Sequence, residues 1–201
     1  MLVLASASPR RQELLRNAGI SFDVQPANID ETPRLGETPQ GYAERLAREK
    51  ALAVWQLRTQ DLVLGADTIV VIDDMILGKP VDFVDGARML RLLSGRVHRV
   101  ITGVCVIGPT SRGELPVARE GELPRSFEQT ASEITLVTMN ELSDDEIRGY
   151  VATGEPMDKA GAYAIQGMAS RWIPRIEGDY SNVVGLPVAL VYAMLRKLGQ
   201  A

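Results

Sequence analysis

Hydrophobic residues recur along this chain with two spacings, one typical of strands and one typical of helices. Apolar runs predict buried strands at Leu2 to Ala5 and, apart from a polar midpoint, at Leu62 to Ile72. A spacing of about 3.6 residues predicts a long helix from about Pro39 to Trp55. The buried stripe of that helix is predicted at Ala43, Leu46, Ala47, Ala51 and Val54.

Turn and capping residues divide the rest of the chain. Ser8-Pro9 and the capping box at Ser143 to Glu146 each predict a helix start, and Asp73-Asp74 predicts a tight turn between strands. Further predicted elements are a strand around Phe22 to Val24, a helix through Leu90 that stops at Ser94-Gly95, strands at Val97 to Ile107 and around Ile134, and a last helix from about Val188 to Leu198.

This order of elements predicts an α/β fold in which a bent mixed β-sheet is flanked by helices, with two lobes around a cleft. With 201 residues, of which 45% are hydrophobic, the chain can bury a sizeable core in a single domain, 1–201. Glycine, proline, arginine and glutamate dominate between Ile107 and Phe127. We expect an exposed connection there between two long antiparallel strands.

Charge and composition exclude several classes of protein. The chain has 22 Lys and Arg against 26 Asp and Glu. Its net charge of -4 gives no overall electrostatic attraction to nucleic acid or to an anionic membrane. The single Cys105 and single His98 cannot fill a zinc site, and His98 has no nucleophile elbow near it. No apolar run approaches the roughly 20 residues of a membrane helix, and the N-terminus lacks a signal pattern, which predicts a cytoplasmic location.

Asp67 interrupts the apolar run from Leu62 to Ile72. A carboxylate in a buried strand must be hydrogen-bonded, neutralised or bound to a cation, because an unpaired buried charge is very costly. One interpretation is a structural bond to a neighbouring turn. The other is a metal ligand or a general base, and Glu31 and Asp67 together could hold Mg²⁺ or Mn²⁺.

Basic side chains in several places could meet a phosphate. The helix start at Ser8, Arg10 and Arg11 offers free amides and two guanidiniums, although it is not a Walker loop. Lys50 falls on the buried stripe of its helix, and Lys79 lies between Gly78 and Pro80. Each also has a structural interpretation, as a capped helix with solvated arginines, a lysine at the core edge or a solvated turn.

Several short motifs occur in order over nearly the whole chain. They are Ser6-Ala7-Ser8-Pro9-Arg10-Arg11, Asp30-Glu31, Arg48-Glu49-Lys50, Gly65-Ala66-Asp67-Thr68, Gly78-Lys79-Pro80, Ser94-Gly95, Gly154-Glu155-Pro156, Asp158-Lys159-Ala160-Gly161 and Asn182-Val183-Val184-Gly185-Leu186-Pro187. Each is weak alone. As an ordered set they resemble the Maf family of nucleotide pyrophosphatases.

The resemblance implies a fold similar to that of inosine triphosphate pyrophosphatases, a nucleoside triphosphate substrate, a bridging divalent cation (Mg²⁺ or Mn²⁺) and a homodimer. On the matching positions, Asp67 is implied to accept the proton of the attacking water, and Glu31 to help hold the metal with it. The residues implied to bind the triphosphate are Ser8, Arg10, Lys50 and Lys79, with Asp158 and Lys159 nearby.

Three positions carry the family's division by substrate. Arg11, Thr68 and Gln166 match the branch of dTTP/UTP pyrophosphatases, whereas the branch acting on 7-methyl-GTP tends to carry Trp, Gln and Glu there. The amide of Gln166 could pair with the O4/N3 edge of a pyrimidine. The chain departs from the family at Ala164, where Gly is common, and in a longer segment around Gly108 to Arg125.

The sequence thus predicts hydrolysis of dTTP, UTP or modified pyrimidine triphosphates to the monophosphate and pyrophosphate, which would keep modified nucleotides from incorporation. Two alternatives stay open. One is a non-catalytic nucleotide- or nucleic-acid-binding regulator, because members of the family have been linked to arrest of cell division. The other is a purine-selective house-cleaning pyrophosphatase.

Overall fold

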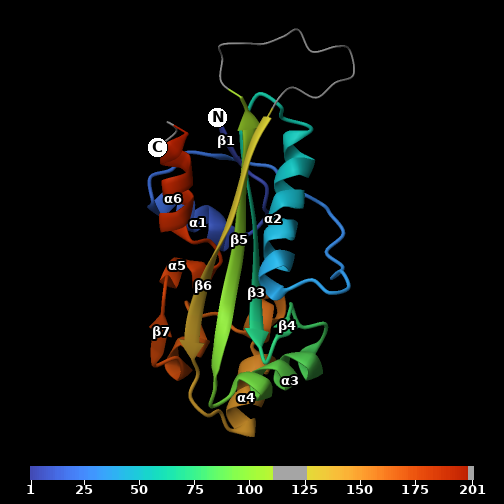
Figure 1. The fold of residues 1–201 in the computed structure, drawn as a ribbon. Coiled ribbons are helices and arrows are strands. Elements are labelled where there is room, and N and C mark those ends of the chain that lie inside the picture. The colour runs from blue at the N-terminus through green and yellow to red at the C-terminus, as the bar shows by residue number, and fades with distance from the viewer. Residues whose placement is uncertain (111–125, 199–201) are drawn as a thin grey trace.

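A computed structural model describes residues 1–110 and 126–198. Its centre is a seven-stranded mixed sheet in the order β2-β1-β3-β5-β6-β7, with β4 paired to β3 beside it (Figure 1). β1 is parallel to β2 and β3, and the other pairs are antiparallel. The strands are β1 (Leu2–Leu4), β2 (Asp23–Val24), β3 (Leu62–Ile72), β4 (Met75–Leu77), β5 (Val97–Pro109), β6 (Ser126–Thr138) and β7 (Arg175–Glu177).

Helices cover both faces of this sheet and one of its ends. In Figure 1, α2 lies on one side of the long strands, α1 and α6 lie on the other, and α3 and α4 close the far end. The α-helices are α1 (Pro9–Asn17), α2 (Pro39–Trp55), α3 (Phe83–Leu93), α4 (Asp144–Ala152), α5 (Tyr180–Val184) and α6 (Val188–Lys197). Three short 3-10 helices are η1 (Glu155–Asp158), η2 (Ala160–Ala162) and η3 (Met168–Trp172). The predicted α/β class with a mixed sheet is confirmed.

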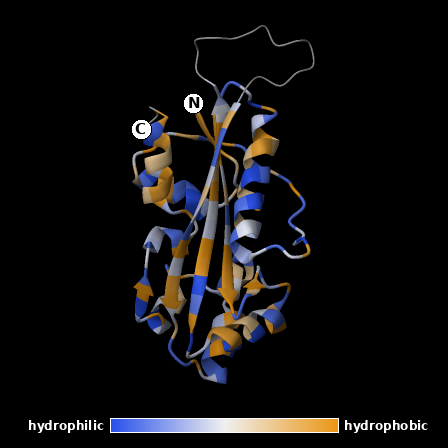
Figure 2. Cartoon of the chain, in the orientation of Figure 1, coloured by the Kyte–Doolittle hydropathy of each residue, from blue (hydrophilic) through white to orange (hydrophobic). Residues whose placement is uncertain are grey.

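The long strand β3 is shared by the cores of two lobes. Leu64 packs toward α1 and α6, while Val63 on the opposite face packs toward α2. Nearer its end, Val70 and Ile72 belong to a separate core with α3, α4 and the 3-10 helices. Hydrophobic residues accordingly concentrate along β3 in Figure 2.

Two glycines let α2 approach the sheet closely. A Cβ at Gly65 would lie 2.1 Å from the carbonyl oxygen of Ala47, and a Cβ at Gly103 would lie 2.3 Å from that of Ala43. The backbone of α2 therefore fills the space beside Gly65, on the strand that carries Asp67. The close contact sets the depth at which α2 places its side chains over β3.

The edge of β3 is open in its middle. β1 pairs with Leu62 to Leu64, and β4 pairs with Val70 to Ile72. Among the described residues, no strand pairs with Gly65 to Ile69 on that edge, while β5 pairs along the other. Side chains from both faces of the sheet can therefore meet at this gap.

Most predicted element boundaries agree with the structure. Asp73 and Asp74 form the expected turn with φ of 48° and 61°, and the capping box of Ser143 and Glu146 starts α4. The predicted connection from Ile107 was wrong at its start, because β5 continues pairing with β6 as far as Pro109. The rest of that connection, and most of the long 108–125 segment, lie outside the described residues. In the part of the chain that the structure covers, no helix combines the length and apolar character needed to cross a membrane.

Candidate active site

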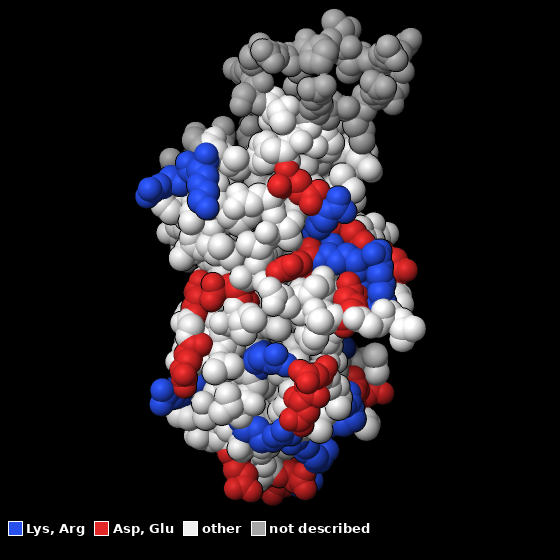
Figure 3. Space-filling model, in the orientation of Figure 1, with Lys and Arg blue, Asp and Glu red and all other residues white. Residues whose placement is uncertain are grey.

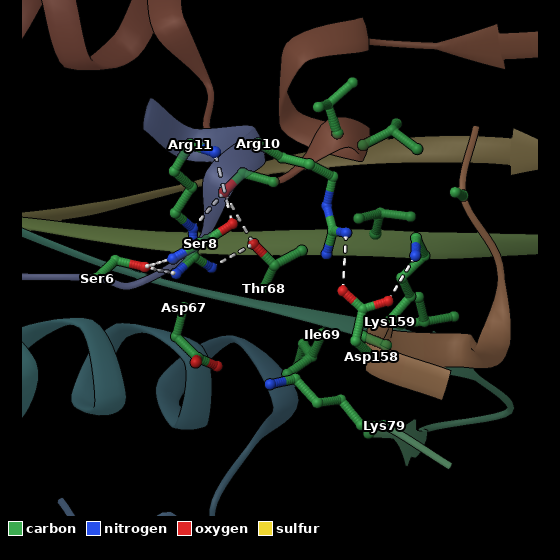
Figure 4. Close-up of a pocket in the computed structure, with 18 of the residues that line it drawn as sticks. Ser6, Ser8, Arg10, Arg11, Asp67, Thr68, Ile69, Lys79, Asp158 and Lys159 are labelled. Carbon is green, nitrogen blue, oxygen red and sulfur yellow. Dashed lines mark hydrogen bonds and ion pairs between the residues drawn. The ribbon is translucent and has the colours of Figure 1, made fainter. Parts of the chain in front are cut away.

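A cavity of about 550 Å³ occupies the gap in the sheet. Its walls come from the β1–α1 loop, α2, the middle of β3, the residues after β4, η1 and the 163–166 and 183–185 segments. Figure 4 shows side chains from these elements converging on it. All of the candidate residues predicted from the sequence line this cavity: Ser8, Arg10, Arg11, Glu31, Lys50, Asp67, Thr68, Lys79, Asp158, Lys159 and Gln166.

Asp67 lies at the base of the cavity on the α2 side of β3, with 8% of its surface exposed. The Nζ of Lys50 on α2 lies 2.6 Å from Asp67 Oδ1 and 2.7 Å from Glu31 Oε1, so one ammonium bridges two carboxylates. Burial raises the pKa of Asp67 above its usual value, while Lys50 and Arg11 act in the opposite direction. The inward orientation predicted for Lys50 is confirmed, since 12% of its side chain is exposed.

The two bridged carboxylates were also the predicted metal ligands. Within residues 1–110 and 126–198, no group of three or more His, Cys, Asp or Glu side chains could hold a metal ion. Mg²⁺, however, commonly binds one or two carboxylates together with substrate phosphates. Glu31 and Asp67 supply hard oxygen donors at the cavity, so these residues fit a cation shared with a bound phosphate.

The start of α1 forms the next wall. Ser8 caps the helix, its Oγ accepting from the backbone N–H of Arg11 at 3.5 Å, while Ser6 Oγ accepts from the N–H of Ser8 at 3.2 Å. Arg10 leaves this helix toward η1, where its Nη1 lies 3.3 Å from Asp158 Oδ2. The end of a helix and a cation thus face the cavity together, an arrangement suited to phosphate oxygens.

Two lysines complete the positive side. The Nζ of Lys159 lies 2.5 Å from Asp158 Oδ1 and donates to the backbone carbonyl of Glu155 at 2.6 Å. Lys79 is exposed, and in the described part of the chain it makes no hydrogen bond or ion pair. In Figure 4 its ammonium points into the cavity, toward the side on which Asp67 lies. Lys79 is therefore free to bind a ligand.

Arg11 and Thr68 lie on the opposite face of β3 from Asp67, and they bond to each other. Arg11 donates to Thr68 Oγ1 at 3.0 Å and to the carbonyl of Gly185 at 2.8 Å. Thr68 Oγ1 lies 2.9 Å from Thr102 Oγ1 on β5. Burial lowers the pKa of Arg11 from its usual value. Gln166, by contrast, is exposed at the cavity and has no hydrogen-bond partner among the described residues.

A family model described as "Maf: Maf-like protein" matches residues 1–198. The chain belongs to the Maf family. Similar proteins named dTTP/UTP pyrophosphatase include one from Koribacter versatilis (strain Ellin345), 54% identical over 198 residues, which are 98% of this chain and 94% of the relative. Another, from Geobacter sulfurreducens (strain ATCC 51573 / DSM 12127 / PCA), is 50% identical over 98% of this chain and 96% of the relative. A solved HAM1 protein from Coxiella burnetii aligns with all of this chain and 98% of its own, at 18% identity and a TM-score of 0.45.

Sequence reasoning missed two residues that support the site of this Maf chain. Tyr42 donates to the backbone carbonyl of Glu31 at 2.7 Å and so holds that segment beside Lys50. Its place one helical turn before Leu46 could have signalled an inward position. Asn182 is fully buried and donates to the carbonyl of Val100 at 3.1 Å. It lies in a motif that the sequence singled out without assigning a role.

Proposed function

We propose that this Maf chain hydrolyses dTTP and UTP to the nucleoside monophosphate and pyrophosphate. The observation that carries the proposal is the buried carboxylate of Asp67 beside Lys50 in a cavity that Arg10, Lys79 and Lys159 also line. Relatives that are about half identical over 98% of the chain and are named dTTP/UTP pyrophosphatase support the substrate class. Modified pyrimidine triphosphates belong to the same class.

In the proposed reaction, Asp67 accepts a proton from a water molecule whose oxygen attacks the α-phosphorus. The bond from the α-phosphorus to the α–β bridging oxygen breaks, and pyrophosphate leaves with that oxygen. A base works best when its pKa lies near the working pH, so the raised pKa of Asp67 favours this role. Lys50 keeps the carboxylate ionised, and Arg10, Lys79 and Lys159 stabilise the departing charge.

Glu31 and Asp67 would hold the divalent cation, Mg²⁺ or Mn²⁺. When bound, such an ion neutralises charge on the phosphate oxygens. Lys50 contacts both carboxylates and so holds them close together. Arg11 and Thr68 lie on the opposite face of β3 from Asp67, and Gln166 also lines the cavity. We place the base of the nucleotide at these three residues.

The test is pyrophosphate release from UTP or dTTP with Mn²⁺. Asp67→Asn keeps the shape of the side chain but removes the base, so we expect kcat to fall by about 10²-fold or more, while the thermal unfolding curve stays cooperative. Asp73→Asn is a matched control, because Asp73 lies at an exposed turn at the end of the same strand. Wild-type activity in Asp67→Asn would overturn the role of Asp67, and release of orthophosphate would overturn the choice of bond.

The two alternatives have their own tests. Acidic and basic side chains are interspersed on the face in Figure 3, which does not favour a nucleic-acid surface, and a DNA binder should lose affinity steeply as salt rises. A purine-selective enzyme would prefer GTP or ATP in a substrate panel. The homodimer and the cytoplasmic location implied by the sequence remain predictions.

A further inference from the structure

The turn that carries Gln166 is held by one carboxylate and one phenol. Glu155 Oε1 accepts from the Tyr150 hydroxyl at 2.8 Å and from the backbone N–H of Met168 at 3.1 Å. The same Tyr150 oxygen accepts from the backbone N–H of Ala164 at 3.1 Å. The two ends of the 164–168 turn are therefore bound to a single hydrogen-bonded pair, with Gln166 between them.

The contact between Glu155 and this turn leaves no spare room. A Cβ at Gly167 would lie 2.2 Å from Glu155 Oε1, so the carboxylate rests directly against the backbone of the turn. Tyr150 is 1% exposed, and its ring meets that of Trp172 edge-on at 5.4 Å between centroids. Burial raises the pKa of Tyr150, which keeps its hydroxyl protonated and able to donate.

The side chain of Gln166 depends on the position of its turn, because it forms no hydrogen bond of its own within the described residues. Its side chain is exposed, and it has no hydrogen-bond partner in the residues that the structure describes. Its direction is therefore set by the backbone of its turn. Glu155 and Tyr150 do not line the cavity themselves, so any effect they have on a ligand passes through that turn.

We propose that Glu155 and Tyr150 are positioning residues for substrate selectivity, which hold the 164–168 turn so that the amide of Gln166 faces the pyrimidine base. The inference rests on the proposed function. Glu155 also accepts the bond from Lys159 through its backbone carbonyl, at 2.6 Å. The segment from Glu155 to Lys159 thus links the base side of the cavity to its phosphate side.

The experiment measures kcat and KM for UTP and for GTP in a set of variants. Glu155→Ala and Tyr150→Phe each remove hydrogen bonds to the turn, and we expect the ratio of kcat/KM for UTP over GTP to fall about tenfold. The loss should appear mainly in KM for UTP, since Asp67 and Lys50 are untouched. Glu155→Gln keeps an acceptor oxygen for Met168 and should retain most of the ratio. Tyr192→Phe is the control, because Tyr192 is exposed on α6.

A double-mutant comparison separates positioning from general damage. In a Gln166→Ala background, Glu155→Ala should change the UTP/GTP ratio little further, because the group it positions is already gone. An unchanged ratio in both Glu155→Ala and Tyr150→Phe would overturn this inference and leave the proposed function standing. A full additional loss in the Gln166→Ala background would also overturn it. A wild-type protein that releases no pyrophosphate from any triphosphate would overturn the proposed function itself.

Discussion

At the scale of single residues, two opposing effects act on the pKa of Asp67. Burial in the middle of β3 raises its pKa, and the ammonium of Lys50 at 2.6 Å favours the ionised form. A buried ion pair of this kind is weak evidence for a stabilising role, since desolvation offsets much of the attraction. Asp67 lies at a cavity that Lys79 also lines, and within the described residues Lys79 has no ion-pair partner, so the position of Asp67 is better explained by chemistry than by stability.

A second buried titratable residue predicts a pH dependence of folding. His98 is 2% exposed, and burial lowers its pKa to about 4 from the ordinary 6.5. Below pH 6.5 the unfolded chain therefore binds a proton that the folded chain accepts only near pH 4. Stability from this residue is fully present above pH 6.5 and is lost as the pH falls to 4, by about 3 kcal/mol. Urea unfolding at pH 7 and at pH 4 measures the loss.

His98→Gln is the matched control for this prediction. Glutamine does not titrate, yet it can still bond to the hydroxyl of Tyr163, which lies 2.8 Å from His98 Nε2. The carboxylates are common to both proteins, so the difference between their pH slopes isolates the histidine. Equal slopes for the two proteins would contradict the assignment.

How far sequence predicts individual residues depends on where their partners lie. Asp67 and Lys50 could be identified because a charge stands out in an apolar run or on an apolar stripe. The residue types of Glu155 and Tyr42 gave no such contrast. Their roles arise from contacts to backbone groups of other segments, as when Tyr42 donates to the carbonyl of Glu31. Periodicity contains no information about such contacts.

At the scale of elements, hydrophobic spacing predicted the long helices but did not predict β7 or the 3-10 helices. The predicted helix from Pro39 to Trp55 coincides with α2, because its stripe persists over 17 residues. β7 has three residues, and the 3-10 helices have three to five, so no period can be read in them. The packing of α2 against Gly65 also could not be predicted, since it is a contact between distant segments.

That packing supports a prediction about α2. In Gly65→Ala the new Cβ would meet the backbone of α2 at Ala47 O, 2.1 Å away, so the helix must move. We expect a loss of stability of about 1–3 kcal/mol or more, with a larger loss of activity because α2 carries Lys50 to Asp67. Chemical denaturation and pyrophosphate release measure the two effects.

Gly149→Ala is the control for the helix displacement. Gly149 lies in α4, and a Cβ there would meet nothing within 4 Å, so alanine should stabilise the protein by about 0.5–1 kcal/mol. If Gly65→Ala left both stability and activity unchanged, α2 would not be fixed by this contact.

At the scale of the whole molecule, the site is assembled from segments far apart in sequence. Arg10 and Asp158, which are 148 positions apart, meet at its edge. In the sequence these residues stand in separate short motifs, and it was the ordered resemblance of those motifs to one family that implied a common site for Arg10 and Asp158. The open edge of β3 between β1 and β4 explains in physical terms why they converge.

A ligand that spans the open edge of β3 should bind only the folded state of the chain, and it should therefore stabilise that state. We expect a non-hydrolysable α,β-imido analogue of UTP with Mn²⁺ at 100 times its Kd to add about 2.7 kcal/mol, or roughly 5–10 °C in Tm. Thermal unfolding with and without the analogue measures this shift. Lys79→Met sharpens the test, because Lys79 is exposed and makes no hydrogen bond or ion pair within the described residues. Its ligand-free Tm should stay within about 2 °C of the wild type while the shift at the same analogue concentration shrinks. An equal shift in both proteins would mean that Lys79 does not contact the phosphates.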